Sequence, residues 1–187
     1  MLGVPGLVNV YREGNVALAN APGAGVADDK SVYAFMPALI RYYLGEDALL
    51  PQIPTYLGAR PPDFAYIRDH IRQLVVKTTG DSGGYGMLMG PSATKREIET
   101  YVAQMKKNPG NYIAQPLIEL SSHPTYTDSK FEARRIDLRP FILYGESVCV
   151  LPGGLTRVAL RPGSYVVNSS QGGGSKDTWV LASKDVA

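Results

Sequence analysis

Apolar residues change their spacing along the chain, and that change limits the folds open to it. Helical spacing, with apolar residues recurring every three or four positions, is found in three segments: 31–44, 63–74 and 92–107. Short apolar runs typical of strands are found at 73–77, 83–89 and 112–120, and again along the C-terminal third. The order of helix, hairpin, helix and then antiparallel strands predicts an α+β fold. No internal repeat is present, so a solenoid is not expected.

Two of the predicted helices carry signals at their ends. Pro37 lies inside the segment 31–44 and predicts either a kink or a later helix start. The segment 92–107 is expected to be capped by Ser92 and to end at Asn108. The segment between the first two predicted helices, 31–44 and 63–74, includes several prolines, so 51–62 is expected to be an extended connection.

Glycine and proline predict where the C-terminal strands turn. The chain contains 20 glycines and 14 prolines, more than usual but too few for a disordered chain. Two hairpins are predicted there: 135–144 with 147–151, and 155–161 with 164–168. The polar segment 121–134 and the glycine-rich segment 169–177 are predicted to be loops.

The charge balance argues against two classes of partner. The 187 residues include 19 basic and 17 acidic side chains, for a formal net charge of +2. A balance this small gives no basic surface of the kind that binds nucleic acid or anionic lipid. No uncharged apolar stretch reaches the ~18–20 residues that span a bilayer, and the N-terminus lacks a signal-peptide pattern. We therefore expect a cytoplasmic protein without nucleic-acid or membrane partners; its oligomeric state is left open.

Cys149 is the single cysteine of the chain. An intrachain disulfide is therefore excluded, and its apolar neighbours predict that Cys149 is buried as a small hydrophobic residue. The two histidines, His70 and His123, lie far from it in the sequence, so a Cys–His nucleophile or a zinc site is not expected.

The strongest local signal for chemistry is a lysine on a strand followed by a glycine-rich turn. Lys77 ends the apolar run 73–77, and glycines are concentrated in the turn from Gly80 to Gly86. Glycines let successive backbone N–H groups approach a phosphate, and a lysine adds a compact positive charge. Asp81 in the same turn could hold the divalent cation of a nucleotide. A plain β-hairpin with a glycine-rich tip is an equally weighted alternative for this segment.

Two further segments carry charge in patterns that suit an anionic substrate. Arg157 precedes the glycine-rich segment 169–177, and an arginine facing such a loop suits a carboxylate or a developing oxyanion. Taken alone, that loop is more often a solvated linker. Arg135, Asp137 and Arg139 alternate along one strand and share a face, where they could line a polar cleft or form a structural salt-bridge ladder.

Taken together, these segments resemble the circularly permuted ATP-grasp family. That family is related to the glutathionylspermidine synthetase-like and eukaryotic-type glutathione synthetase-like ligases. The resemblance covers essentially the whole chain, and it depends on several short motifs occurring in one order. The motifs are MLGVPGL at 1–7, NVALAN at 15–20, GVADDKSVY at 25–33, SGGYGM at 82–87, YIAQ at 112–115, DLRPF at 137–141, PGGLTRVAL at 152–160 and VNSSQGGGSKDTW at 167–179.

The resemblance implies antiparallel sheets with flanking helices, forming two lobes around a nucleotide cleft. It divides the chain into a connecting segment (1–62), a lobe with the glycine-rich loop (63–115) and an antiparallel lobe with a substrate-side loop (116–187). The implied residues at the ATP site are Lys30, Lys77, Ser82, Gly83, Gly84, Tyr85, Gly86, Gln115 and Leu117, with Asp81 as a magnesium ligand. The implied catalytic residues are Arg157 and Arg139. The implied substrate-binding residues are Asn168, Gln171, Gly172, Gly173 and Gly174.

The implied reaction is ATP-dependent ligation, in which a carboxylate of a small molecule or peptide becomes an acyl phosphate that an amine then attacks. Relatives of this type are longer and carry further magnesium ligands upstream, so we expect this chain to correspond to their C-terminal portion and to be catalytically incomplete. Two alternatives remain open: a nucleotide-binding or interaction module without catalysis, and a small-molecule phosphotransferase on the same scaffold.

Overall fold

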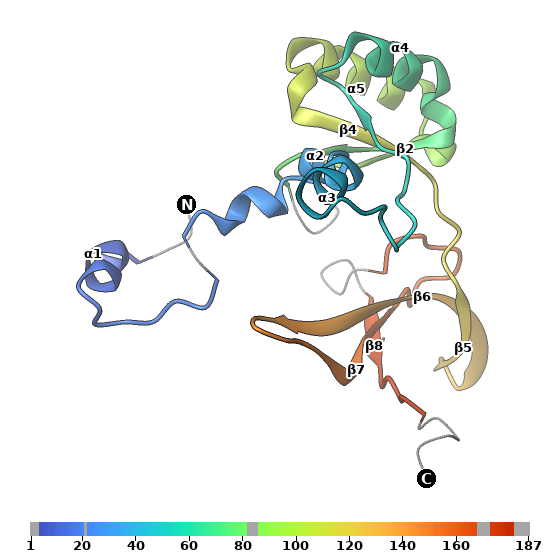
Figure 1. Cartoon of the computed structure of the whole chain (residues 1–187). Coiled ribbons are helices and arrows are strands. Elements are labelled where there is room, and N and C mark those ends of the chain that lie inside the picture. The colour runs from blue at the N-terminus through green and yellow to red at the C-terminus, as the bar shows by residue number, and fades with distance from the viewer. Residues whose placement is uncertain (1–3, 21, 82–85, 168–172, 182–187) are drawn as a thin grey trace. The chain divides into compact units, whose positions relative to one another are not determined.

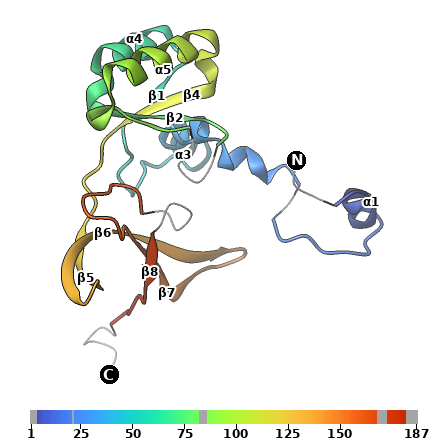
Figure 2. The ribbon, with the colours of Figure 1, turned by 180° about the vertical axis from the view of Figure 1, so that it is seen from behind.

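The computed structural model describes residues 4–20, 22–81, 86–167 and 173–181. The chain divides into two compact units, one formed by Met1–Gly80 with Leu88–Gln115 and the other by Asp81–Met87 with Pro116–Ala187. The labels in Figure 1 number the helices and strands in the order of the sequence, and Figure 2 shows the same ribbon from behind. The α+β prediction is confirmed, since helices accompany two sheets, and five of the strand pairs in the described residues are antiparallel.

A sheet in the order β1-β4-β2-β3 forms the centre of the first unit. Its strands are β1 (Tyr56–Leu57), β2 (Leu74–Thr78), β3 (Leu88–Met89) and β4 (Tyr112–Pro116). The predicted hairpin is confirmed because β2 pairs antiparallel with β3, with Val76 opposite Leu88. Successive side chains of a strand point to opposite faces of the sheet, so each of these strands supplies one face to a core and the other to a second surface.

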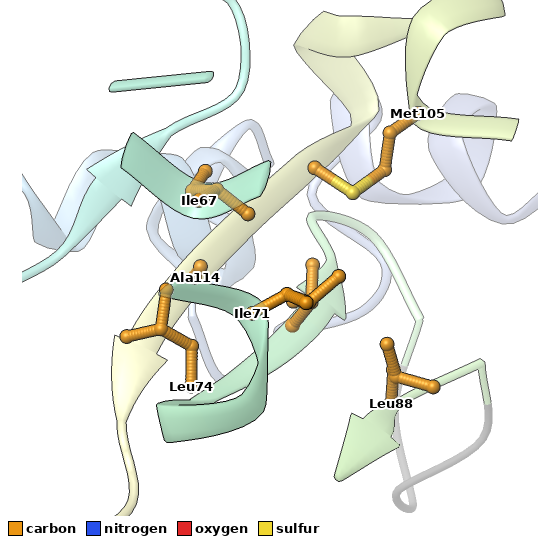
Figure 3. Close-up of a cluster of buried hydrophobic side chains, with 7 residues drawn as sticks. Ile67, Ile71, Leu74, Leu88, Met105 and Ala114 are labelled. Atoms are coloured by element: carbon orange, nitrogen blue, oxygen red, sulfur yellow. The ribbon is translucent and has the colours of Figure 1, made fainter. Parts of the chain in front are cut away.

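Two helices, α4 (Pro61–His70) and α5 (Lys95–Lys107), cover one face of this sheet. The buried residues shared by helices and sheet include Ile67, Val76 and Met105, each no more than 1% exposed. Figure 3 shows Ile67, Ile71, Met105 and Leu74 gathered in this cluster. Truncating side chains buried to this extent costs about 2–5 kcal/mol, so this cluster is the stabilising core of the first unit.

The start of α5 differs from the prediction. Thr94, rather than Ser92, caps the helix: its hydroxyl accepts a hydrogen bond from the Glu97 backbone N–H, and the Glu97 side chain bonds the Thr94 N–H in return. Ser92 instead ends a 3₁₀ turn at Gly90–Ser92. The T-x-x-E spacing is a capping box. It is a stronger helix start than Ser92 because it satisfies two backbone N–H groups, those of Thr94 and Glu97. The predicted end at Asn108 is confirmed.

The N-terminal segment of the first unit contains short helices. They are α1 (Leu7–Arg12), a 3₁₀ turn at Ala24–Asp28, α2 (Lys30–Tyr33) and α3 (Met36–Leu44). The predicted helix 31–44 is therefore broken, and Pro37 lies in the first turn of α3, where its missing N–H leaves no bond unmade. For the same reason α4 begins at Pro61 instead of Asp63, inside the connection that was predicted to be extended.

The second unit is built on a sheet in the order β5-β6-β7-β8. Its strands are β5 (Ser122–Thr127), β6 (Lys130–Tyr144), β7 (Val148–Val158) and β8 (Gly174–Lys176). The hairpin across Gly145-Glu146 is confirmed as β6 with β7. The loop predicted at 121–134 is wrong, since it forms β5, a turn and the start of β6. Asp128 and Ser129 make that turn with positive φ angles. The turn was not predicted because positive φ angles are usually found at glycine, and this turn contains none.

The second predicted C-terminal hairpin is also wrong. Residues 155–158 continue β7 instead of starting a new strand, and 164–167 form no strand. The partner of β7 comes from the segment predicted to be a loop, because β8 pairs with it and places Ser175 opposite Arg157. The proline and glycine after Arg161 mark a turn correctly, but the chain continues beyond it before pairing.

The outer part of the β6–β7 hairpin exposes apolar residues on both faces. Ile142, Leu143, Tyr144 and Val148 are each at least 58% exposed. Cys149 is exposed in the same hairpin, so the prediction that it is buried is wrong. Its apolar neighbours do predict a strand, but the side chains of this part of the strand are exposed among the described residues. No helix in the described part of the chain is long and apolar enough to cross a membrane.

Candidate functional site

The face of the first sheet that lies opposite the α4–α5 core carries the polar residues of interest. In β2, Leu74 and Val76 belong to the core cluster, so the alternation of side chains turns Lys77 to the other face. In β4, Ala114 belongs to the core cluster, and the same alternation turns Gln115 to the face of Lys77. Because β4 and β2 are neighbours in the sheet, the two side chains meet.

Gln115 connects Lys77 to the edge strand. The Lys77 ammonium donates to the Gln115 side-chain oxygen at 2.8 Å, and the Gln115 amide nitrogen donates to the Thr55 hydroxyl at 2.9 Å. The register explains the second contact. Tyr56 pairs with Ala114 in antiparallel strands, so Thr55, one residue before Tyr56, lies opposite Gln115. Gln115 is 9% exposed, which makes these contacts part of the interior.

Lys30 reaches the end of β2 from a different part of the chain. It is the first residue of α2, where Asp29 caps the helix by accepting a hydrogen bond from the Ser31 N–H at 2.8 Å. The Lys30 backbone N–H and its side-chain ammonium both donate to the carbonyl of Thr79, at 3.1 and 3.3 Å. Two residues that are 47 positions apart in sequence, Lys30 and Lys77, are thereby brought to the same end of one strand.

The carbonyl that Lys30 contacts is itself held in place. The Thr79 backbone N–H donates to the Asn111 carbonyl at 3.0 Å, and the Thr79 hydroxyl donates to the Asn111 side-chain oxygen at 3.2 Å. Asn111 directly precedes β4, so the helix that carries Lys30 is anchored to both central strands of the sheet.

The environment of Lys77 disfavours its charged form. Burial lowers the pKa of the Lys77 ammonium below the usual lysine value, and the nearby positive charge of Lys30 lowers it further. Within the described residues, no carboxylate forms an ion pair with Lys77. A buried cation beside a second cation is stabilised by an anion that lies between them. The side-chain oxygen of Gln115, which is uncharged, is the acceptor of the Lys77 ammonium, so this contact does not neutralise the lysine.

The glycine-rich turn that was predicted to cover the phosphates lies mostly outside the described residues. Ser82, Gly83, Gly84 and Tyr85 belong to that part, and their role stays a prediction. Asp81 and Gly86, at its two ends, are exposed and fall in the second unit. The described residues contain no group of three His, Cys, Asp or Glu side chains that could hold a metal ion.

In the second unit, Arg157 is paired across two strands. It lies opposite Asp137 in the β6–β7 register, its Nε donates to one carboxylate oxygen at 2.8 Å, and its Nη2 contacts the other. The hydrogen bond that Arg157 donates to Asp137 raises the pKa of the Arg157 guanidinium above its usual value. Arg139 lies on the same strand as Asp137 and is exposed. Asp137 therefore belongs to a salt bridge with Arg157 across two strands, and the predicted polar cleft along Arg135, Asp137 and Arg139 stays a prediction.

The remaining predicted residues are distributed around β8 and the start of the second unit. Gly174 begins β8, and Gly173 directly precedes it. Asn168, Gln171 and Gly172 lie outside the described residues, so their predicted contact with a substrate stays a prediction. Leu117 follows β4 and is partly buried in the second unit, whereas Gln115 ends the first unit.

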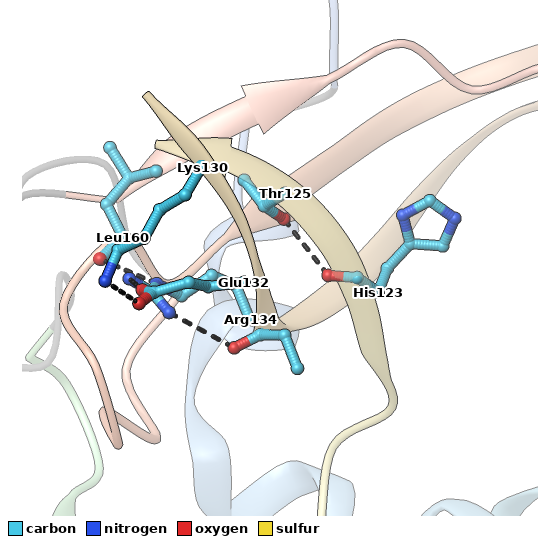
Figure 4. Close-up of polar contacts among 7 residues, drawn as sticks. His123, Thr125, Lys130, Glu132, Arg134 and Leu160 are labelled. Atoms are coloured by element: carbon cyan, nitrogen blue, oxygen red, sulfur yellow. Dashed lines mark hydrogen bonds and ion pairs between the residues drawn. The ribbon is translucent and has the colours of Figure 1, made fainter. Parts of the chain in front are cut away.

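Sequence reasoning missed the residues that support this site. Thr55 and Asn111 were not expected to matter, because each acts through a partner more than 30 positions away. In the second unit, away from these contacts in the sequence, Arg134 was also given no role: it is 5% exposed, pairs with Glu132 and donates to the Leu160 carbonyl at 3.0 Å (Figure 4). A helical or strand period predicts which face a residue takes, but not which distant residue meets it.

The relatives of this chain are longer than it is. An uncharacterized protein of Synechocystis sp. is 60% identical to it over 97% of this chain and 38% of its own length. An uncharacterized protein of Mycobacterium tuberculosis is 51% identical over 97% of this chain and 33% of its own length. A Frankia alni protein, named provisionally as glutamate–cysteine ligase 2-3, is 44% identical over 94% of this chain and 20% of its own length. The chain thus spans about a fifth to two fifths of these relatives.

The sequence model of the circularly permuted ATP-grasp type 2 family matches residues 1–159. That match includes both lysines, the strand that carries Gln115, and Arg157 with its partner Asp137. It extends over most of the chain and agrees with the mixed helix and strand architecture of both units. The chain belongs to the circularly permuted ATP-grasp type 2 family.

Proposed function

We propose that the first unit holds the phosphates of Mg–ATP between Lys30 and Lys77, as part of an ATP-dependent carboxylate–amine ligase. One observation carries the proposal. Both lysines lie at the end of β2, close enough for Lys30 to lower the pKa of Lys77, and the Lys77 ammonium has a neutral amide as its hydrogen-bond partner. A site built in this way retains positive charge for an incoming polyphosphate.

The ligase chemistry is proposed from the family and from the relative named as a glutamate–cysteine ligase. A carboxylate oxygen of the first substrate attacks the γ-phosphorus of ATP, and ADP leaves. The nitrogen of an amine then attacks the acyl carbon, inorganic phosphate leaves, and the nitrogen loses a proton to give an amide. The contribution of the lysines is to position the phosphates and to offset their charge.

Arg139 and Arg157 are proposed for the substrate side of the reaction. An arginine binds a carboxylate through two parallel N–H groups, and Arg157 already binds Asp137 in this way. Magnesium would arrive with the nucleotide, with Asp81 as its proposed ligand. Gly173 and Gly174 are proposed to leave the backbone open to the acceptor, together with Asn168, Gln171 and Gly172.

Titration calorimetry with Mg–ATP tests the binding part of the proposal. The unmodified chain is expected to bind Mg–ATP, and Lys77→Met is expected to weaken the affinity about tenfold or more, because a charge-assisted contact to phosphate is lost. Lys95→Met is the matched control, since the Lys95 side chain is 85% exposed on α5. Absence of binding by the unmodified chain would contradict the proposal.

A hydroxamate assay tests the chemical part and separates the alternatives. Trapping of an acyl hydroxamate with a carboxylate, ATP and hydroxylamine supports ligation. Binding of ATP without any trapped product, in a longer relative as well as in this chain, would favour a nucleotide-binding module. A phosphorylated alcohol or amine as the product would identify a phosphotransferase.

A further inference from the structure

A directional series of hydrogen bonds leads away from Lys77. The Thr55 hydroxyl donates to the Ile53 carbonyl at 3.0 Å, which leaves its oxygen as an acceptor. The Gln115 amide nitrogen donates to that oxygen at 2.9 Å, so the amide oxygen of the same side chain points to the Lys77 ammonium, 2.8 Å away. Reversing the amide would place its N–H₂ group against the ammonium, donor against donor.

The other end of this series returns to the helix that carries the second lysine. The Ile53 backbone N–H donates to the Tyr33 hydroxyl at 2.9 Å. Tyr33 is the last residue of α2, and Lys30 is its first. Hydrogen bonds therefore link the strand of Lys77 to the helix of Lys30 through Gln115, Thr55 and the segment around Ile53.

The chemical type of the acceptor matters for the charge of the site. A carboxylate at position 115 would satisfy the same ammonium but would also cancel its charge. A carboxamide gives a hydrogen bond and leaves the positive charge for another anion. Lys30, whose charge lowers the pKa of Lys77, is also positive. The Gln115 amide has no net charge, so it neutralises neither lysine.

We propose that Gln115 and Thr55 are positioning residues for the phosphate site: Thr55 fixes the orientation of the Gln115 amide, and the amide directs the Lys77 ammonium without neutralising it. This inference rests on the proposed function, because it assigns the retained charge to the phosphates of ATP. It also gives Gln115 a role through its side chain, whereas the sequence predicted a contact with the nucleotide.

The test uses the full 187-residue chain and three variants, Gln115→Glu, Gln115→Met and Thr55→Val. Competitive amine labelling over a range of pH, read out by mass spectrometry, measures the pKa of Lys77 without nucleotide, with Lys107 as an exposed internal standard. Calorimetry measures the affinity for Mg–ATP. The matched controls are Gln104→Glu and Thr100→Val, both at exposed positions of α5, and thermal unfolding checks that each variant is folded.

The two Gln115 variants are expected to shift the pKa of Lys77 in opposite directions. Gln115→Glu raises it, because a carboxylate stabilises the ammonium, and Gln115→Met lowers it, because the acceptor is lost. Both are expected to weaken Mg–ATP binding about tenfold, the first by cancelling charge and the second by releasing the ammonium. Thr55→Val is expected to lower the pKa less and to weaken binding about threefold. A role in folding alone would not shift the pKa in two directions.

Two outcomes separate this inference from the proposed function. If the pKa of Lys77 is the same in the folded variants as in the unmodified chain, the positioning role is overturned, even where Mg–ATP still binds. If the pKa responds as expected but the unmodified chain binds no Mg–ATP, the hydrogen-bond series is supported and the proposed nucleotide function is overturned. Thr55→Val keeps the test valid should a Gln115 variant fail to fold.

Discussion

At the scale of single residues, Lys77 shows how position changes the chemistry of a side chain. It is one of the chain's many basic residues, yet burial and a neighbouring lysine lower its pKa. An exposed lysine would keep its usual pKa and would bind anions weakly, because water and salt screen its charge. The same position therefore destabilises the unbound protein, and under the proposed function a bound phosphate would offset that cost.

This destabilisation predicts a dependence on pH. Between the lowered pKa of Lys77 in the folded chain and its usual value of 10.5, the unfolded chain binds more protons than the folded one. The free energy of unfolding is therefore expected to rise with pH through that window as far as Lys77 is concerned. Lys77→Met is expected to remove this rise and to increase Tm near neutral pH by about 2–4 °C, the shift that ~1 kcal/mol produces in a chain of this size.

Thermal unfolding at several pH values measures the effect of Lys77→Met. The control is Lys95→Met on the exposed surface of α5, which is expected to leave the pH dependence unchanged. A loss of stability in Lys77→Met at neutral pH would contradict the account, since it would mean that the charged lysine stabilises the unbound chain.

Gly90 is a second residue whose identity is set by its surroundings. A Cβ atom at this position would lie 1.7 Å from the carbonyl oxygen of Ile71 and 2.5 Å from that of Leu74. Gly90→Ala is therefore expected to lower the free energy of unfolding by about 3 kcal/mol or more, since backbone must move. Gly110→Ala is the control, because nothing lies within 4 Å of its Cβ position. Chemical denaturation that finds equal stabilities for the two variants would disprove this packing argument.

At the scale of elements, α5 tests how helix starts are selected. Thr94 and Glu97 form reciprocal hydrogen bonds at its first turn, and the bonds to Thr94 lower the pKa of the Glu97 carboxyl group. Thr94→Ala is expected to lower the free energy of unfolding by about 1 kcal/mol, the usual value for an N-cap. Ser92→Ala, the cap predicted from the sequence, is expected to change it by no more than about 0.5 kcal/mol. Denaturant titrations in which Ser92→Ala is the more damaging substitution would restore the original prediction.

The elements differ in how well the sequence predicts them. The β2–β3 hairpin and α5 have strong local signals: a compact apolar run before a glycine-rich turn, and a regular helical period. β5 was missed because only Thr125 on it is buried, so its polar sequence is typical of a loop. β8 was missed because Gly174–Lys176 has no strand propensity of its own and depends on pairing with β7.

The candidate site was predicted in part for the same reasons. Lys77 was found because a lysine at the end of an apolar strand is a local signal. Lys30 entered only through the family resemblance, since nothing near it in the sequence indicates that it meets Thr79. The supporting contacts of Gln115 and Thr55 depend on strand register, which the sequence does not specify for a strand as short as β1.

At the scale of the whole molecule, the chain consists of two units, each with its own sheet. The two lysines belong to the first unit, and Arg157 with Asp137 belongs to the second. The chain spans 38% of the length of its Synechocystis relative, so the full ligase reaction is a proposal for the longer proteins. Nucleotide binding is the part of the proposal that can be measured directly on this chain.

The most direct test of the central claim is a double-mutant cycle for Mg–ATP binding, measured by titration calorimetry on the unmodified chain, Lys30→Met, Lys77→Met and the double variant. If both lysines contact the same phosphates, each single substitution weakens binding and the two effects are not additive, with an interaction energy of about 0.5–3 kcal/mol. Absence of Mg–ATP binding by the unmodified chain, or an affinity that neither substitution changes, would contradict the claim.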